Sequence, residues 1–394
     1  MTDPVNQRPA VALLSYSTRP RGGVVHTLAL AEALHAAGWP VHLYMLGDPN
    51  KGLYRPTTAP HTVLQAPERL PTLEERVFAS IDAMEAGLAQ ALPDDIRLLH
   101  TQDCIAARAA ERIKEQRADT VVLRTVHHVD DFTTQALIDC QLNSIINPDH
   151  RLVVSRYWQQ RLHQEYGLSS QVVTNGVDAE RFAREPSIDP ASLRERADAD
   201  GRFLFLSVGG LEPRKGGYEL VEAFAEARSH ITPTPKLAIV GGHSFQDHAA
   251  YRDRCLRRAE ELGLGDDLVL VGTVSDEELP AWYHAADAFV LPSVNEGWGL
   301  VVLEAMAAGL PVIVTELPVF REYLDDEDAD FVPIHDAPEL ARSMVKLATD
   351  AEHLQRRARR GPTVARRFSW AATAEQHMEA YRQAARSPVQ AARP

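Results

Sequence analysis

Residues suited to ligand binding are densest between residues 292 and 311, where the sequence reads PSVNEGWGLVVLEAMAAGLP. An apolar run ends at the first proline of this segment, and a glycine-flanked loop follows. We expect a helix to begin near Trp298 and to end near Gly309, because glycine favours the left-handed conformation that closes a helix. The free N–H groups in the first turn of such a helix attract a phosphate. The segment therefore predicts an anion site between a strand and a helix.

Two carboxylates flank this predicted anion site. Glu296 lies in the loop beside Gly297 and Gly299, and glycine lets a backbone approach its ligand closely. Glu304 lies about two turns further along the chain. Carboxylates do not bind phosphate, but they accept hydrogen bonds from sugar hydroxyl groups on either side of a diphosphate. The pattern favours a nucleotide-sugar site, and the alternative is a solvent-facing helix with ordinary surface glutamates.

The spacing of the two glutamates in EGWGLVVLEAMAAGLPV resembles the signature of the retaining family-4 glycosyltransferases. The resemblance implies that the first glutamate contacts the donor hexose and that the second binds the nucleotide ribose. It also implies that the backbone amides between them hold the diphosphate. Trp298 stands where the family often has phenylalanine. The donor-binding residues implied in this segment are Glu296, Gly297, Trp298, Gly299, Leu300 and Glu304.

A second segment, FLFLSVGGLEPRKGGYELVEAF, resembles the first strand, loop and helix of the family's donor domain. The resemblance implies that Lys215 binds the donor diphosphate. The family usually has an arginine where this chain has Gly210. Arginine pairs with phosphate in a bidentate way, so its loss would weaken donor binding. We expect Arg214 to supply the missing cation, and the alternative is that Arg214 only caps the loop.

The amino-terminal half carries further motifs that resemble the family. In RPRGGVVHTLALAEAL, Gly22 and Gly23 match the glycine loop that meets the donor phosphates, although simple turn glycines are the alternative. In RTVHHVDDF, His127 matches a histidine whose usual role is contact with the donor sugar near the reacting centre. His128 and Asp130 are expected to orient His127 or to meet the acceptor.

Two shorter segments complete the set of motifs. In TQDC, Asp103 is predicted either to face the ligand site or to cap the helix that follows. The combination of YSTRPRGGVVHT, TQDC, RTVHHVDDF and GGLEPRKG also resembles a narrower bacterial subfamily found beside nitrilase-type genes.

The elements that must position these residues alternate between short β-branched runs and longer helical stretches. The runs are apolar throughout, as in strands covered on both faces, and the repeated succession predicts parallel, doubly wound α/β sheets. About a dozen strands exceed one comfortable sheet. We therefore predict two Rossmann-like domains facing a cleft, with ligands at the carboxyl ends of the strands. The resemblance gives this arrangement the name GT-B.

The predicted acceptor-side domain spans residues 1–180 and is joined by a returning carboxy-terminal helix at 369–386. The predicted donor-binding domain spans 181–368, and the charged segment 184–200 is expected to be a linker. Strands are expected at 11–16, 41–46, 97–101, 121–126, 152–155, 172–174, 203–208, 237–240, 268–271, 288–292, 312–315 and 331–333.

The composition argues against several other classes of protein. With 41 Lys and Arg against 55 Asp and Glu, the formal net charge is −14, which disfavours nucleic acid as a partner. The sequence shows no signal-peptide pattern and no apolar run near the roughly 18 residues of a membrane span, so we expect peripheral membrane contact at most. The 3 cysteines suit neither a disulfide framework nor a zinc site, so a reducing cytoplasm is the expected setting.

We expect the site to work without a metal or another cofactor. Metal-dependent GT-A transferases place an Asp-x-Asp at a strand end, whereas the triplets here lie in acidic connecting segments at 198–200, 326–328 and 328–330. Lys215, Arg214 and the helix start would instead offset the charge of the leaving diphosphate. The predicted reaction moves a hexosyl unit from a nucleotide-diphosphate sugar to an unidentified acceptor with retained anomeric configuration. The alternatives are a sugar-nucleotide epimerase or hydrolase of the same fold, and a noncatalytic sugar-binding protein.

Overall fold

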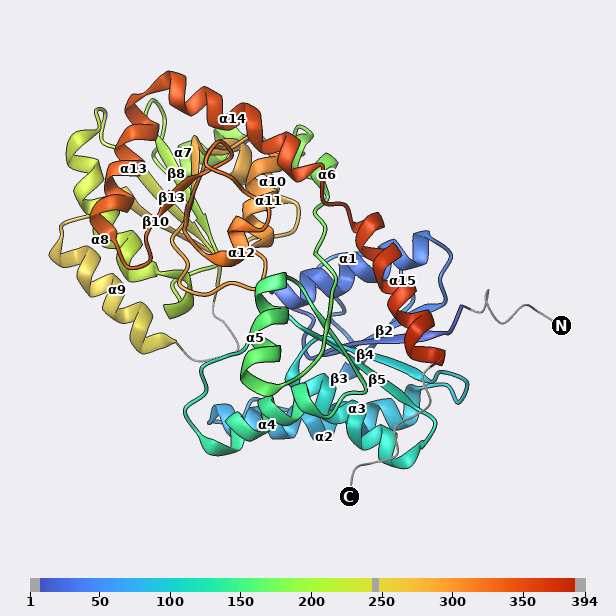
Figure 1. Ribbon diagram of the computed structural model, residues 1–394. Coiled ribbons are helices and arrows are strands. Elements are labelled where there is room, and N and C mark those ends of the chain that lie inside the picture. Colours follow the sequence, from blue (N-terminus) through green and yellow to red (C-terminus); the bar gives the residue numbers. More distant parts are fainter. Residues whose placement is uncertain (1–7, 243–247, 387–394) are drawn as a thin grey trace. The chain divides into compact units, whose positions relative to one another are not determined.

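The computed structural model describes residues 8–242 and 248–386, and the chain divides into two compact units (Figure 1). The first unit holds the chain up to Gly176 together with the part from Trp370 onward, and the second unit holds Val177–Ser369. The chain therefore enters the second unit once and returns to the first unit for its last helix.

The first unit is built on a seven-stranded sheet with the order β3-β2-β1-β4-β5-β6-β7, in which every pairing is parallel. The strand order reverses between β1 and β4, which makes their carboxyl ends the switch point where ligands of such sheets bind. The strands are β1 Val11–Ser15, β2 Val41–Gly47, β3 His61–Gln65, β4 Leu98–Thr101, β5 Val121–Val126, β6 His150–Val153 and β7 Gln171–Val172.

Helices cover both faces of this first sheet (Figure 1). Helices α1 and α15 pack on each other, and α3 packs on both α2 and α4. Leu13 and Leu43, paired in register across β1 and β2, belong to the same buried core as Tyr381 and Ala384 of the last helix. The helices are α1 Gly22–Ala36, α2 Leu73–Ala91, α3 Cys104–Gln116, α4 Gln135–Ile146, α5 Arg156–Tyr166 and α15 Trp370–Arg386.

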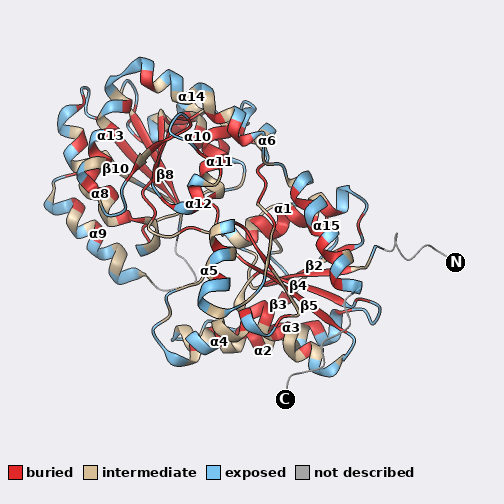
Figure 2. Ribbon diagram, viewed as in Figure 1, coloured by how far each residue is buried: buried red, intermediate tan, exposed pale blue. Residues whose placement is uncertain are grey.

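The second unit repeats this plan with a six-stranded parallel sheet of order β10-β9-β8-β11-β12-β13. Here the order reverses between β8 and β11. Figure 2 shows the inner strands of this sheet buried beneath exposed helix faces, which explains why they are mostly apolar, whereas the edge strand β10 is only half-buried. The strands are β8 Leu204–Val208, β9 Lys236–Val240, β10 Leu268–Gly272, β11 Ala288–Leu291, β12 Val312–Thr315 and β13 Asp330–Val332.

The helices of the second unit pack on one another as well as on the sheet. Helix α8 packs on α9 and α13, whereas α11 packs on α6 and α14, and α10 packs on α7. The helices are α6 Ala179–Ala183, α7 Pro190–Arg196, α8 Gly217–Ala227, α9 Ala249–Glu261, α10 Glu278–Ala285, α11 Leu300–Ala307, α12 Pro318–Arg321, α13 Ala337–Thr349 and α14 Ala351–Ala365.

The predicted parallel, doubly wound sheets are confirmed, and the observed strands lie within about two residues of the predicted ones. Two expectations were wrong. Strand β3 was missed, since HTVLQ is short and mostly polar or half-buried at the edge of its sheet. The expected linker at 184–200 contains helix α7, which begins after the capping residue Asp189. Arg194 of this helix donates to the carbonyl of Ala285 at 2.6 Å, so the segment is part of the second unit.

Candidate functional site

The two loops with the donor-binding motifs meet at the switch point of the second sheet. One follows β8 and the other follows β11, and these strands are neighbours. The N–H of Val294 donates to the carbonyl of Arg214 at 2.8 Å, which ties the loops together. Gly216 has a φ of 65°, and a Cβ at this position would lie 2.0 Å from the carbonyl oxygen of Pro292. Glycine is therefore required for the loops to pack this closely.

This packing brings the side chains of Lys215 and Glu296 into contact. The Lys215 Nζ lies 2.5 Å from the Glu296 Oε1, and Ser293 Oγ donates to the same oxygen at 2.8 Å. Arg214 adds a second cation, with its Nη1 at 3.6 Å from the Glu296 Oε2. The structure thus gathers the three predicted charged residues into one cluster at the carboxyl end of the sheet.

Burial and neighbouring charges shift the pKa values of Glu296 and Lys215 in opposite directions. Burial alone raises the pKa of Glu296, but the ammonium of Lys215 and the guanidinium of Arg214 outweigh it and lower that pKa. Burial lowers the pKa of Lys215, and Glu296 opposes that effect. We take the pair to be ionised, since each charge lies against the opposite one. The lysine has only 10% of its side chain exposed, whereas Arg214 has 36% and is the more accessible cation.

Glu304 lies on α11 and has a different partner. The hydroxyl of Tyr283, on α10, donates to the Glu304 Oε2 at 2.8 Å. Burial raises the pKa of Glu304, although the hydrogen bond from Tyr283 lowers it in part. The pKa values of the two glutamates of the motif are thus shifted in opposite directions. Glu296 is held as a carboxylate by two cations, whereas Glu304 lies in a buried site with a phenol.

The segment between the two glutamates turns into α11 later than expected. The helix begins at Leu300 rather than near Trp298, because Gly299 adopts a left-handed φ of 86° at the helix start. A Cβ on Gly299 would lie 2.6 Å from the Phe320 ring. The end of the helix near Gly309, with a φ of 80°, is as predicted.

The indole of Trp298 is buried within the second unit rather than placed on its surface. Its ring packs on Tyr323 at 4.7 Å and on Phe368 at 5.4 Å between centroids. The hydroxyl of Tyr323 donates to the carbonyl of Trp298 at 2.9 Å. Trp298 therefore anchors the backbone of the loop formed by Gly297 and Gly299, and its aromatic character is what this position requires.

The backbone conformation explains why this chain has glycine at position 210, where the family usually has arginine. Gly210 has a φ of 73°, and a Cβ there would lie 3.0 Å from the carbonyl oxygen of Gly242. An arginine at this position would be strained in this backbone. Arg214 lies beside Glu296 and so carries its positive charge into the same cluster, as the sequence predicts for a replacement cation.

The motifs of the first unit gather at the switch point of its own sheet. Gly22 and Gly23 are the first residues of α1, not of a preceding loop, and a Cβ on Gly23 would lie 3.9 Å from the His127 ring. His127 directly follows β5. Its Nε2 lies 3.0 Å from the Oε1 of Gln102, which follows β4. Gly23 and His127 are therefore neighbours.

His127 belongs to a cluster of four histidines. The ring of His26 packs edge-on against His127 with centroids 4.7 Å apart, and His377 lies 6.0 Å from His26 and 5.4 Å from His100. Burial lowers the pKa of all four rings, and the nearby Arg124 lowers that of His127 further. For His377 the value falls to about 4. These imidazoles are therefore neutral at neutral pH.

The remaining predicted residues of the first unit have separate partners. Asp103 caps α3, because its Oδ1 accepts from the Ala106 N–H at 2.7 Å, and its Oδ2 accepts from the Tyr16 N–H at 2.9 Å. His128 contacts Asp130, with 3.2 Å between Nε2 and Oδ1. His127 and His128 thus have different polar partners.

Sequence reasoning missed the residues that support the motif residues. Gln102 lies inside the quoted TQDC segment, and its position directly after β4 is the signal that would have identified it. Ser293 had a similar signal, since it lies in the segment 292–311 and close after β11. Tyr283 had none, because its contact with Glu304 depends on how α10 packs.

The acidic triplets 326–328 and 328–330, two of the three considered as metal ligands, contact basic side chains. Asp330 accepts from Arg357 at 2.6 Å and from His353 at 2.7 Å, and Asp328 lies 2.8 Å from Arg360. These contacts use two arginines, Arg357 and Arg360, of the arginine-rich segment 356–360 on α14. In the part of the chain that the structure describes, no group of three or more His, Cys, Asp or Glu side chains is arranged to hold a metal ion.

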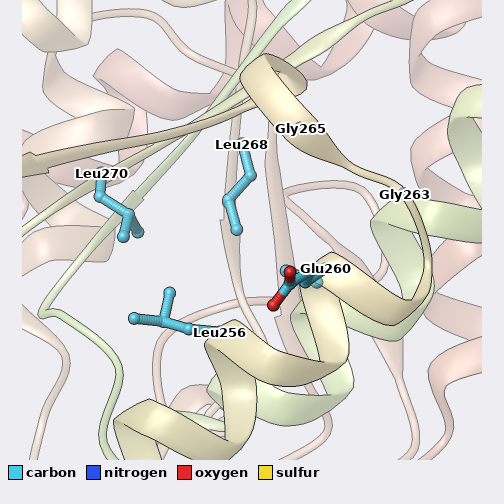
Figure 3. A pocket seen from close by; sticks show the side chains of 7 residues that line it. Leu256, Glu260, Gly263, Gly265, Leu268 and Leu270 are labelled. Carbon is cyan, nitrogen blue, oxygen red and sulfur yellow. The ribbon is translucent and has the colours of Figure 1, made fainter.

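A pocket of about 400 Å³ lies elsewhere, between α9 and the start of β10 (Figure 3). None of the predicted site residues lines it; its walls come from Leu256, Ala259, Glu260, Gly263, Gly265, Leu268 and Leu270. Within residues 8–242 and 248–386, no helix has both the length and the apolar character needed to cross a membrane.

Two family models match successive parts of the chain. The model described as Glycosyltransferase Family 4 matches residues 20–181, and the model described as Glycosyl transferases group 1 matches residues 190–364. The first match includes the histidine and glycine motifs, and the second includes the Lys215, Glu296 and Glu304 motifs.

Curated relatives match the whole chain or parts of it. The chain is 26% identical over 390 residues to the phosphatidyl-myo-inositol mannosyltransferase of Mycobacterium leprae, covering 94% of this chain and 96% of that protein. It is 28% identical over 317 residues to the mannosylfructose-phosphate synthase of Agrobacterium fabrum, covering 76% and 67%. It is 36% identical over 169 residues to a GDP-mannose-dependent α-(1-6)-phosphatidylinositol monomannoside mannosyltransferase of Mycolicibacterium smegmatis. That match spans 41% of this chain and only 42% of the relative.

Solved structures share the fold over nearly the whole chain. Sucrose-phosphate synthase from Thermosynechococcus elongatus has a TM-score of 0.78 at 25% identity, covering 95% of this chain and 99% of that one. Anabaena HepE in complex with UDP-glucose has a TM-score of 0.77 at 19% identity, covering 95% and 99%. The two parallel Rossmann-like sheets and the two family models, which match residues 20–181 and 190–364, support a glycosyltransferase of the family-4 type with the GT-B fold.

Proposed function

We propose that this glycosyltransferase moves a hexosyl unit from a nucleotide-diphosphate sugar to an acceptor hydroxyl, with retained configuration and without a metal ion. The observation that carries the proposal is the contact of Lys215 and Arg214 with Glu296 at the switch point of the second sheet. This cluster offers both kinds of group that such a donor needs: cations for the diphosphate and a carboxylate for sugar hydroxyls.

The donor would be held along the segment from Glu296 to Glu304. The N-terminus of α11 would receive the diphosphate, since its first N–H groups and its dipole favour an anion. Lys215 and Arg214 would offset the charge that develops on the leaving diphosphate. Glu296 would accept hydrogen bonds from the hexose, and Glu304 would accept them from the ribose.

His127 would act at the reacting centre as a neutral imidazole. Its depressed pKa makes it a poor source of charge, so its contribution is a hydrogen bond to a hydroxyl group. In front-face attack the departing phosphate takes the proton of the acceptor, and no covalent enzyme intermediate forms. A scheme without a metal ion is supported by the pairing of the acidic triplets 326–328 and 328–330 with arginine and histidine side chains.

The relatives suggest which compounds to test first. One is named for GDP-mannose, and others are named for phosphatidyl-myo-inositol, D-inositol 3-phosphate and mannosylfructose phosphate. We therefore propose GDP-mannose as the first donor and phosphorylated polyols as the first acceptors. The resemblance to the subfamily found beside nitrilase-type genes remains part of the proposal and names no acceptor.

A thermal-shift screen over a panel of nucleotide-diphosphate hexoses tests donor binding. A ligand at 100 times its dissociation constant stabilises a protein by about 2.7 kcal/mol, which is readily measured. Proton NMR of the product then tests the stereochemistry. Retention of the donor's anomeric configuration supports the proposal, and a product of inverted configuration contradicts it.

A further inference from the structure

Gln102 lies buried between two histidines at the carboxyl end of the first sheet, with 3% of its surface exposed. Its backbone N–H donates to the carbonyl of Leu14 at 3.1 Å, which fixes the residue to β1. Its Oε1 lies 3.0 Å from the Nε2 of His127, and its Nε2 lies 3.1 Å from the Nε2 of His100. The side chain therefore links the predicted functional histidine to a fully buried one.

The surroundings of His100 determine which way the amide points. His100 Nδ1 lies 2.8 Å from the hydroxyl of Tyr381, and its Nε2 lies 2.7 Å from the hydroxyl of Thr125. The amide nitrogen of Gln102 lies at similar distances, 3.1 and 3.4 Å, from the two ring nitrogens, so it approaches the face of the ring. An amide N–H is attracted to the electron-rich face of a neutral ring, whereas a carbonyl oxygen is repelled. The amide nitrogen therefore belongs at His100 and the amide oxygen at His127.

This orientation has a consequence for His127. An amide oxygen only accepts hydrogen bonds, so the Nε2 of His127 must carry the proton and donate it to Gln102. In a neutral ring the other nitrogen, Nδ1, then keeps its lone pair. No hydrogen bond to this Nδ1 is found among the described residues.

We propose that Gln102 is a positioning residue that holds His127 in the Nε2–H tautomer, so that Nδ1 accepts a hydrogen bond from a substrate hydroxyl group. The first part follows from the contacts in the first unit, and the last clause rests on the proposed function. A histidine that accepts a hydrogen bond from a hydroxyl group of the donor sugar holds that sugar at the reacting centre without a change in its own charge, and the proton of the acceptor is left for the departing phosphate. A partner fixed by the sheet keeps the ring from turning over and offering its N–H instead.

Nitrogen NMR of the full chain with ¹⁵N-labelled histidine tests the tautomer without any turnover, and loss of one signal set in His127→Asn assigns the ring. The wild type is expected to show a protonated Nε2 and an unprotonated Nδ1 at neutral pH. In Gln102→Glu the carboxylate still accepts from Nε2, and its charge should raise the pKa of His127 by about 1–3 units. In the isosteric Gln102→Leu the ring is expected to lose its single tautomer and to show a mixture. A proton on Nδ1 in the wild type, or an unchanged His127 pKa in Gln102→Glu, would overturn the proposal.

Steady-state kinetics on the same variants separates this inference from the proposed function. Gln102→Leu is expected to lower kcat by about 10–100-fold, the range of outer-shell partners of functional histidines, with little change in the donor KM. Gln102→Glu is expected to recover activity at high pH, with the acid limb of its profile moved upward by the shift that NMR measures. If the NMR signals move as expected while kcat stays normal, the role of His127 in transfer is wrong and the tautomer assignment stands. If kcat falls equally in both variants at every pH, Gln102 only maintains the fold and the proposal is overturned.

Discussion

Lys215 and Glu296 are 81 residues apart in sequence, yet their side chains meet at 2.5 Å and are almost completely buried. Burying two charges costs free energy, and their attraction repays it only when both partners are present. In this protein the pair lies where a charged ligand is expected. We therefore regard it as a preformed part of the donor site whose stability depends on both residues.

Removing one partner of this pair should destabilise the second unit more than removing both. Lys215→Met leaves the buried Glu296 carboxylate without the ammonium group that lies 2.5 Å from it, and should lower the free energy of unfolding by about 3–5 kcal/mol. Lys215→Met combined with Glu296→Gln should recover a large part of that loss. Urea unfolding of the two single variants and the double variant measures the coupling. Strictly additive losses would show that the two side chains do not interact.

The two glutamates should affect ligand binding differently. Glu304→Ala removes an acceptor for the ribose and should weaken binding of the free nucleotide diphosphate by roughly 1.5–3 kcal/mol. Glu296→Ala should leave nucleotide binding nearly intact and should damage turnover of the sugar donor. Titration calorimetry with the nucleotide diphosphate and kinetics with its sugar provide the two measurements.

Tyr283→Phe is the matched control for Glu304, because it removes the phenol that donates to this carboxylate and keeps the ring. It should change nucleotide affinity less than Glu304→Ala does. Equal losses of nucleotide affinity in Glu296→Ala and Glu304→Ala would contradict the assignment of Glu296 to the hexose and of Glu304 to the ribose.

The adjacent histidines of the first unit should also behave differently. His127→Ala should lower kcat and kcat/KM together by about 10²–10³-fold and should leave donor affinity and the melting temperature almost unchanged. His128→Ala should be milder, since His128 contacts Asp130 and should affect mainly stability or the acceptor KM. Steady-state kinetics beside calorimetric melting compares them. Near-normal turnover in His127→Ala with collapsed turnover in His128→Ala would mean that the other histidine is the functional one.

The fold and most of the site were predictable because strand ends and glycine loops are local features of the sequence. Lys215 and Glu296 follow the two strands on either side of the switch point, and parallel strands bring such loops together. The partners of these residues were not predictable. Tyr283 contacts Glu304 only because α10 packs beside α11, and Gln102 contacts His127 because β4 and β5 are neighbours in register.

The backbone explains the departures from expectation. The sequence does not reveal that Gly210 takes a left-handed backbone conformation. From the sequence, the absence of the family's arginine at this position was therefore expected to weaken donor binding, whereas the conformation of the loop favours glycine. Helix α7 was read as part of a linker because the segment 184–200 is charged and contains Pro186 and Pro190. Its packing depends on contacts such as that of Arg194 with Ala285, 91 residues away.

The histidine cluster predicts a stability that falls in acid. The folded-state pKa of His377 is about 4, against an ordinary value of 6.5, because burial disfavours the charged ring. Below pH 6.5 the unfolded chain binds a proton at this histidine, whereas the folded chain does not bind it until the pH approaches 4. The contribution of His377 to the free energy of unfolding is therefore fully present above pH 6.5 and is lost as the pH falls toward 4. His377→Gln should reduce the loss between pH 7.5 and pH 5 by about 2 kcal/mol. Urea unfolding at the two pH values measures it, with the exposed His35→Gln as control. The same loss in wild type and His377→Gln would contradict the assignment.

We propose acceptor-dependent transfer from a nucleotide-diphosphate sugar at the Lys215–Glu296 site. Release of nucleotide diphosphate is the measurement that tests it most directly, made in excess EDTA with and without a pool of polyol acceptors. We expect nucleotide diphosphate to be released at full rate in EDTA, and only when an acceptor is present. In Glu296→Gln this release should be nearly lost. Release without any acceptor, binding without turnover in every pool, or strict dependence on added magnesium or manganese would contradict it.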